Sequence, residues 1–191
     1  MALVLTSGPA VEPVTLDEVK AHLRIDGNLE DVLLSSLILT SRLHIEASLD
    51  VALIDQTWTL RLDRWPKTCD VEIPLSPLHA ITSVKVKDAS SMWLTVPPTS
   101  YLTDVASRPP RLVFNAAGRP VPGTRAAGIE IVFSAGFGST PASVPAPLRH
   151  AIILLVAHWY EHRDATEAGS PEARIPSVIS DLIAPFRKIR L

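Results

Sequence analysis

The chain has 191 residues, which is enough for one substantial hydrophobic core or for a core with a small subdomain. Its formal net charge of −2 argues against a surface dedicated to nucleic acid, which usually carries a marked excess of Lys and Arg. The single cysteine, Cys69, excludes an internal disulfide framework and a zinc site built from several cysteines, and it favours a reducing compartment.

The sequence also indicates a protein without a membrane partner. No apolar run approaches the ~20 residues that span a bilayer, and no basic region precedes the short apolar patch in MALVLTSGPAVEP. We therefore expect a soluble, unexported chain.

The distribution of proline predicts how the chain is organised. Of the 17 prolines, none lies between Val14 and Trp65, and all but two lie from Pro66 onward. We predict an α+β fold, in which N-terminal helices and a long C-terminal helix form a helical core with an inserted small antiparallel β-sheet or barrel. The expected parts are an N-terminal helical part (1–55), a β-rich subdomain (56–140), and the C-terminal helices with a tail (141–191).

Two helices are predicted in the first part. Thr15 and Glu18 have the spacing of a capping box, so a short helix should run from there to about Leu23. Asn28 is a suitable N-cap for a second helix that ends near Ser48. Apolar residues recur along this second segment at helical spacing: Leu33, Leu34, Leu37, Ile38 and Ile45.

The middle of the chain has the alternation of short strands. Trp58, Leu60 and Leu62 alternate with polar residues, which predicts a half-buried strand over residues 56–63. Similar runs separated by proline-rich turns predict further strands at 71–73, 81–87, 93–96, 101–103, 111–115 and 129–134. Trp58, Trp65 and Trp93 alternate with polar residues rather than with Lys or Arg, so they are predicted to be core residues rather than a ligand-stacking surface.

The longest helical segment is predicted to run from Pro145, as its first helical residue, to Arg163. Its apolar residues cover most of the circumference, so neighbouring elements or other subunits must bury them. The stripe at 3.6-residue spacing consists of Leu148, Ile152, Leu155, Val156 and Trp159, and Ile153, Leu154 and Ala157 widen it.

The end of this helix carries a possible zinc motif. His158, Glu161 and His162 have the H-x-x-E-H spacing, which places two imidazoles on one helix face with a glutamate nearby. A catalytic zinc needs a third protein ligand, and the downstream candidates are Glu167, Glu172 and Asp181. Capping of the helix C-terminus by His and Arg is the favoured interpretation, so we predict no catalytic residue, metal or cofactor.

The last part is predicted to contain a loop over residues 164–176, a short helix over 178–184, and a tail. Three apolar and three cationic residues interleave in that tail: Phe186, Arg187, Lys188, Ile189, Arg190 and Leu191. The residues alone leave two interpretations open. One is a frayed terminus, and the other is an arm that docks on an acidic partner surface through its apolar anchors.

The order of these segments resembles the phage head-tail connector (adaptor, head-completion) proteins, including the adaptors of gene transfer agents. The resemblance covers nearly the whole chain. It is carried by VTLDEVKAHLRIDGNLEDVLL, QTWTLRLDRWP, IPLSPLHAITSVKV, IEIVFSAGFG, VPAPLRHAIILLVAHWYEHRD and IPSVISDLIAPFRKIRL.

The resemblance implies a non-enzymatic ring subunit at the head-tail junction of a phage or phage-like particle, assembled in the bacterial cytoplasm. The implied partners are the portal protein, neighbouring copies in a ring of twelve, the next head-completion or tail component, and DNA that passes through the channel without specific binding. By the same resemblance the C-terminal arm, from Ile183 to Leu191, would engage the portal.

A closed ring requires two different complementary faces on each subunit. The candidate ring-interface residues lie on the long helix: His150, Leu154, His158 and Glu161. Two alternative functions stay open, a zinc-dependent hydrolase at residues 158–162 and a small nucleic-acid-binding module in the strand-rich region.

Overall fold

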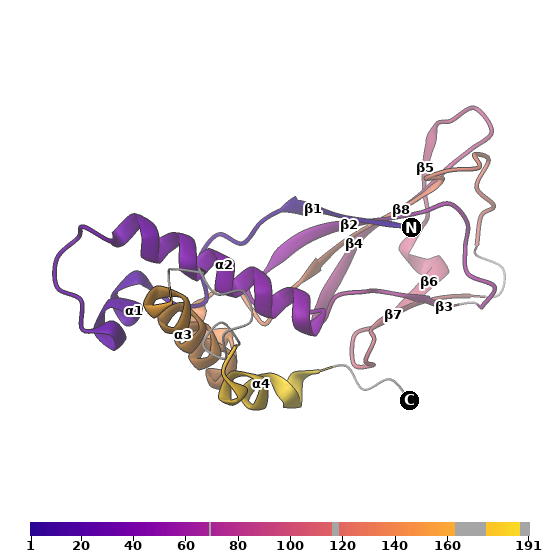
Figure 1. Cartoon of the computed structure of the whole chain (residues 1–191). Helices are drawn as coiled ribbons and strands as arrows, with labels where there is room; N and C mark the ends of the chain where they lie inside the picture. Colours follow the sequence, from indigo (N-terminus) through magenta and orange to yellow (C-terminus); the bar gives the residue numbers. More distant parts are fainter. Residues whose placement is uncertain (69, 116–118, 163–174, 188–191) are drawn as a thin grey trace. The chain divides into compact units, whose positions relative to one another are not determined.

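The computed structural model describes residues 1–68, 70–115, 119–162 and 175–187, and these form two compact units (Figure 1). The unit that we call the sheet unit consists of Met1–Pro9 and Asp55–Gly136. The second, the helical unit, consists of Ala10–Ile54 and Phe137–Leu191. Each unit therefore combines two segments that are far apart in the sequence.

The sheet unit contains two antiparallel sheets. The larger has the order β1-β2-β8-β4-β5, formed by Ala2–Ser7, Gln56–Leu62, Ile129–Ala135, Leu78–Lys87 and Trp93–Thr95. The smaller has the order β3-β7-β6, formed by Asp70–Glu72, Arg111–Phe114 and Tyr101–Asp104. Within the described residues β1 and β5 are edge strands and the sheet does not close, so the predicted α+β fold is confirmed with an open sheet and not a barrel.

Strand β8 is the centre of the larger sheet. It pairs antiparallel with β2 and β4, so that Ile131 lies opposite both Leu60 and Val84. Alternate residues of β8 point into the core and are fully buried: Ile129, Ile131, Phe133 and Ala135. This period of two is the pattern from which the strand was predicted.

Strand β1 was missed by the sequence analysis, which placed its residues with the helices. It pairs with β2, with Leu3 opposite Leu60 and Leu5 opposite Trp58. The β1 segment does not alternate between polar and apolar residues, because it is an edge strand in which the neighbouring Val4 and Leu5 are both exposed. Its position depends on hydrogen bonds to a strand about 50 residues away, which no local pattern encodes.

The tryptophans differ in their environments. Trp65 packs its ring edge against Phe114, with ring centroids 4.7 Å apart, and its indole N–H donates to the Pro120 carbonyl at 2.6 Å. Trp58 is half-buried on β2. The core prediction is wrong for Trp93, which is exposed on the edge strand β5 and instead carries the Lys87 ammonium 4.8 Å from its ring centroid.

The helical unit contains α1 (Leu16–Leu23), α2 (Asp31–Leu49), α3 (Ala146–Glu161) and α4 (Ser177–Ile183), followed by a 3₁₀ turn over Ala184–Phe186. The helices share one hydrophobic core, and α2 and α3 lie side by side in it (Figure 1). The members of this core with 0% of their surface exposed are Val19, Leu34, Ile45, Leu53, Leu148, Ala151, Ile152, Leu155 and Val156.

The observed starts of α1 and α2 agree with one of the two capping predictions. The capping box is confirmed, because the Glu18 N–H donates to Thr15 Oγ1 at 3.2 Å and the Thr15 N–H donates to Glu18 Oε2 at 2.7 Å. Asn28 was wrong as an N-cap, since α2 begins at Asp31 after Glu30.

At the start of α3 the prediction is off by one residue. Pro145 is the N-cap, with φ −51° and ψ 132°, and the helical residues begin with Ala146. A second proline, Pro147, lies in the first turn, where a missing N–H costs no intrahelical hydrogen bond. The helix ends at Glu161, and the predicted last residue, Arg163, lies outside the described residues.

By length and composition alone, one helix of the described residues, α2, is apolar enough to cross a membrane, which the sequence analysis did not anticipate. Its buried side accounts for part of this apolarity, because Leu34, Ile38 and Ile45 belong to the helical core.

Candidate functional site

The C-terminal segment, predicted as a docking arm, begins at the end of the last helix. Phe186 is half-buried and packs against the core of the helical unit. Arg187 follows it as an exposed residue, and its N–H donates to the Ala184 carbonyl at 3.1 Å. Lys188, Ile189, Arg190 and Leu191 lie outside the described residues. One of the proposed apolar anchors, Phe186, is thus already packed within the chain.

The four candidate contact residues on α3 do not share one exposed surface. His150 and Glu161 are exposed, and Leu154 is half-buried against the helical core. His158 has only 9 % of its surface exposed. Of the four candidates, only the first and the last, His150 and Glu161, are therefore exposed.

The histidine pair at the end of α3 has the geometry of a helix cap. The His162 Nδ1–H donates to the His158 carbonyl oxygen at 2.8 Å, and the two ring centroids are 4.6 Å apart. Burial lowers the pKa of His158, and the neighbouring His162 lowers it further. A buried His158 beside a ring that satisfies a C-terminal carbonyl fits the favoured capping interpretation.

The described residues do not bring a third metal ligand to this pair. Within 1–68, 70–115, 119–162 and 175–187, no three His, Cys, Asp or Glu side chains come together as a metal site. Glu161 and Asp181 are exposed, and Glu167 and Glu172 lie outside the described residues.

A buried ion-pair network in the helical unit was missed by the sequence analysis. Arg42 on α2 donates from Nε to Glu12 at 2.8 Å and from its terminal nitrogen to Glu46 at 2.7 Å. The other Glu46 oxygen accepts the Leu53 N–H at 2.9 Å. The i, i+4 spacing of Arg42 and Glu46 was a usable signal for the pair, but nothing local indicated its burial.

A second arginine, Arg149 on α3, fixes the residues that lead into α1. Its Nε donates to the Pro13 carbonyl at 3.1 Å, and its terminal nitrogen pairs with Glu18. The hydrogen bond from the Thr15 backbone is the largest cause of a lowered pKa at Glu18. Segments 131 residues apart in the sequence are thereby joined through the capping box.

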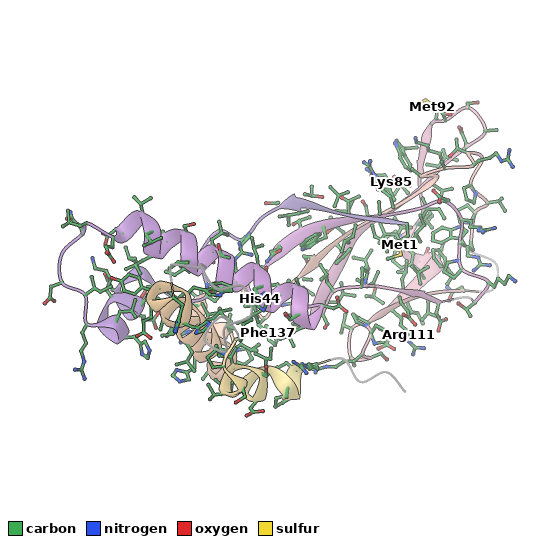
Figure 2. All side chains as sticks on the ribbon, in the orientation of Figure 1. Met1, His44, Lys85, Met92, Arg111 and Phe137 are labelled. Atoms are coloured by element: carbon green, nitrogen blue, oxygen red, sulfur yellow. The ribbon has the colours of Figure 1, made fainter. Side chains whose placement is uncertain are left out.

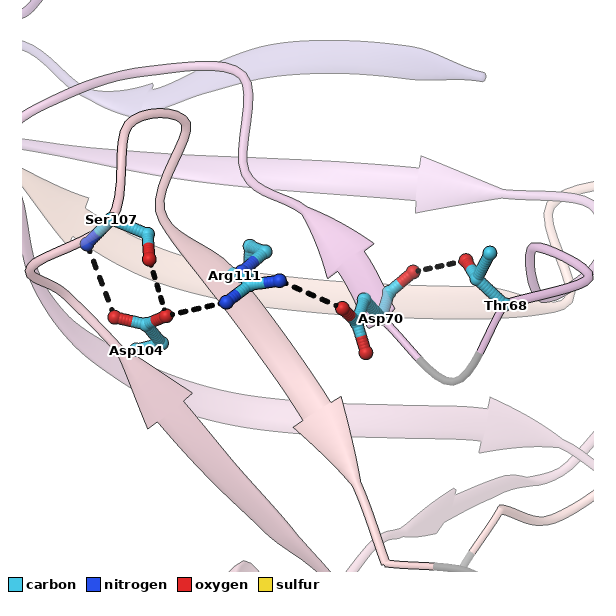
Figure 3. Close-up of polar contacts among 5 residues, drawn as sticks. All are labelled: Thr68, Asp70, Asp104, Ser107 and Arg111. Atoms are coloured by element: carbon cyan, nitrogen blue, oxygen red, sulfur yellow. Dashed lines mark hydrogen bonds and ion pairs between the residues drawn. The ribbon is translucent and has the colours of Figure 1, made fainter.

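In the sheet unit, Arg111 on β7 connects two neighbouring strands (Figure 3). It donates to Asp70 of β3 at 3.0 Å and to Asp104 of β6 at 2.9 Å. The Ser107 hydroxyl and N–H also donate to Asp104. These hydrogen bonds, with Ser107 contributing most, lower the pKa of Asp104 to about 2. Arg111 thus joins all three strands of the smaller sheet through its side chain, and we call this arrangement the Arg111 clamp.

We expect the Asp104 carboxyl to titrate with a midpoint near pH 2, and Ser107→Ala to move that midpoint toward the ordinary value of 3.8. Because the folded pKa is depressed, the stabilisation from this clamp is present above about pH 4 and is lost as the pH falls toward 2. NMR titration of the carboxyl carbon measures both midpoints. Thr68→Ala is the control, since Thr68 bonds only the Asp70 carbonyl in this cluster (Figure 3); an equal shift in both variants would contradict the assignment.

Exposed large apolar side chains gather in each unit. In the helical unit they are Val11, Leu29, Val32, Leu33, Leu39, Leu43 and Val178, and most of these lie on or just before α2. In the sheet unit they include Leu94, Leu102, Val121, and Met92 at the tip of the β4–β5 turn (Figure 2). Exposed apolar side chains that lie together are candidate contact surfaces.

The chain is similar to one protein family and to chains of solved particle structures. Residues 13–92 match the sequence profile of the Phage gp6-like head-tail connector protein family. A chain from the neck of an empty GTA particle, computed with C6 symmetry, is 28% identical with a TM-score of 0.84, covering 100% of this chain and 97% of that one. A chain from the neck of a native GTA particle, computed with C12 symmetry, is 27% identical with a TM-score of 0.81 and the same coverages.

A further chain, from the virion of a native gene transfer agent (GTA) particle, is 26% identical with a TM-score of 0.81, covering 100% of this chain and 97% of that one. The curated proteins contain no match.

Proposed function

Because residues 13–92 match the phage gp6-like head-tail connector family and the whole chain is similar to GTA neck chains, we propose that it is a structural adaptor of this family at the head-tail junction of a phage or phage-like particle. The observation that carries this proposal is the similarity over the whole chain to a GTA neck chain, at 28% identity and a TM-score of 0.84. In this role the protein joins the portal vertex to the tail and catalyses no reaction.

The proposed assembly is a cyclic ring of twelve copies around a DNA channel. Support comes from the neck chain in the particle computed with C12 symmetry. A ring subunit uses one face against a different face of the next copy, so that the contacts close on themselves. The neighbouring copies, the portal protein and the next head-completion or tail component are the proposed partners.

DNA is proposed to pass through the channel without being held. The net charge of −2 supports this, because strong phosphate binding requires an excess of cations. In the sheet unit, Arg61 pairs with Glu130 at 3.2 Å, and Arg111 pairs with two aspartates. These cations are neutralised within the chain, which also weakens the alternative of a nucleic-acid-binding module.

The C-terminal segment is proposed to dock on the portal, and its removal tests the function. Deleting residues 187–191 is expected to leave the fold and its Tm unchanged, because Phe186 stays packed on the helical core. Binding to the cognate portal should weaken by about 100-fold or more, since the cations and the remaining apolar residues of the segment are lost together. Biolayer interferometry with immobilised portal measures the affinity.

Two further variants separate the contributions of charge and apolar contact. Replacing Arg187, Lys188 and Arg190 with Ala should make the remaining binding insensitive to salt. Replacing Ile189 and Leu191 with Ser should weaken binding while leaving its salt dependence in place. Portal affinity of the truncated chain equal to that of the full chain would refute the docking role.

A further inference from the structure

Helix α2 exposes a row of residues that the described parts of this chain do not cover. Val32, Ser36, Leu39 and Leu43 succeed one another at intervals of four, three and four residues, and we call them the α2 face. All four are exposed, with 85% of the surface of Val32, 42% of Leu39 and 50% of Leu43 accessible. Alternating intervals of four and three place side chains along a single helix seam, the arrangement that receives another helix.

The exposed side of α2 carries no carboxylate, ammonium or guanidinium. The charged residues of this helix are used elsewhere, because Asp31 pairs with Lys20 at 2.8 Å while Arg42 and Glu46 are buried and paired with each other. The exposed residues are Val32, Leu33, Ser35, Ser36, Leu39, Thr40, Leu43, His44, Ala47 and Ser48. A helix on the surface of a globular protein normally has charged residues on its outer side, so this composition is typical of a surface that a partner covers.

A shallow groove adjoins the α2 face. It has a volume of about 370 Å³ and is lined by Val11, Glu12, Val14, Thr15, Leu16, Ser35, Ile38 and Pro141. Ser35 and Ile38 belong to α2, so the groove borders the seam directly. The one carboxylate in the lining, Glu12, is paired with Arg42. The groove therefore adds an apolar recess beside the seam and no free charge.

We propose that the α2 face is a subunit contact and that its occupant is a second copy of this chain, which packs a helix along the seam. This inference rests on the proposed ring. Neither DNA nor an acidic partner fits the surface, because it offers no cation. In a cyclic assembly each copy covers the same face of its neighbour, so such a face stays out of water in every subunit.

The head-to-tail contact also needs a second, different patch on each copy. Of the four α3 candidates, the exposed His150 and Glu161 are proposed to belong to that second patch. The C-terminal segment is separate from both patches in this scheme, so binding to the portal and contact between copies are separable by mutation.

The test is a double variant, Leu39→Glu with Leu43→Lys, compared with wild type by mass photometry in mixtures with the cognate portal. Both residues are exposed, and a Glu four residues before a Lys is a favourable pair on a helix, so the variant should fold normally by circular dichroism. The matched control, Leu94→Glu with Leu102→Lys, places the same charges at exposed leucines of the sheet unit.

We expect wild type and control to fill the portal cooperatively. The α2 variant should still bind through its C-terminal segment, but without cooperativity. Contact between copies should be about 100-fold weaker, because burying the two introduced charges costs more desolvation energy than their mutual attraction returns. Cooperative filling by the α2 variant would overturn the inference while the adaptor function stands. An equal loss in the control would overturn the assignment to α2.

Two other outcomes overturn the inference in distinguishable ways. Failure of wild type to bind the portal at all would remove the adaptor function and the inference with it. Flotation of wild type, but not of the α2 variant, with phosphatidylcholine–phosphatidylglycerol vesicles would show that a membrane occupies the face, in line with the length and composition of α2.

Discussion

Replacing Arg42 with Met is expected to lower the free energy of unfolding by about 3–5 kcal/mol, because it leaves a buried carboxylate without its cation. The Arg42 side chain is only 6% exposed and the Glu46 side chain only 10%. Met preserves the aliphatic length and the helix propensity at this position, so the loss reports the charge. Urea unfolding followed by circular dichroism at 222 nm measures the difference.

Arg61→Met is the matched control, since Arg61 also pairs with a glutamate but is 50% exposed. It should cost no more than about 1 kcal/mol, as exposed ion pairs generally do. Adding Glu46→Gln to Arg42→Met should recover roughly 1–3 kcal/mol, because an amide removes the buried negative charge that has lost Arg42 and still accepts the Leu53 N–H. Equal costs for the two arginine variants would show that the buried network does not stabilise the helical unit.

Gly136→Ala is expected to cost about 2–6 kcal/mol, because it combines backbone strain with a steric clash. Gly136 has φ +152°, a conformation that residues with a side chain rarely adopt. A Cβ at this position would lie 2.6 Å from the Asp55 backbone nitrogen and 2.7 Å from its Cα, and backbone atoms there cannot turn away as a flexible side chain could. Both residues belong to the sheet unit, at the points where the chain enters and leaves it.

Gly27→Ala separates the two contributions. Gly27 has φ +88°, and no atom lies within 4 Å of the position that an alanine methyl group would take, so only backbone strain of about 1–2 kcal/mol applies. Thermal unfolding of both variants, followed by tryptophan fluorescence, gives the comparison. A Gly136→Ala variant as stable as Gly27→Ala would mean that the close approach to Asp55 relaxes without cost.

The elements that sequence analysis predicted well are those set by local rules. The Thr15–Glu18 capping box depends on two residues three positions apart, and it forms as predicted. The strands other than β1 were predicted from alternation between proline-rich turns, and β8 keeps that alternation in its burial. These patterns determine structure because a period of two or a cap acts within a few residues.

The errors in prediction arose where distant contacts decide the outcome. Asn28 has good capping chemistry, but the helix begins at Asp31, where Lys20 of α1 supplies an ion pair. Trp93 alternates like a core residue but lies on an edge strand, so one side of it faces solvent and Lys87. Strand β1 exists only because β2 provides its hydrogen-bonding partner.

The sequence by itself determined the fold class, most elements and, through the order of its segments, the resemblance to head-tail connectors. Only the tertiary structure decided which surfaces are free. It buried His158 and packed Phe186 inward, while it left Leu39 and Leu43 uncovered on a helix whose Asp31, Arg42 and Glu46 are all paired. Which side chains are exposed depends on how the helices pack around one core. The sequence alone does not distinguish an apolar residue that this core buries from one that a partner covers.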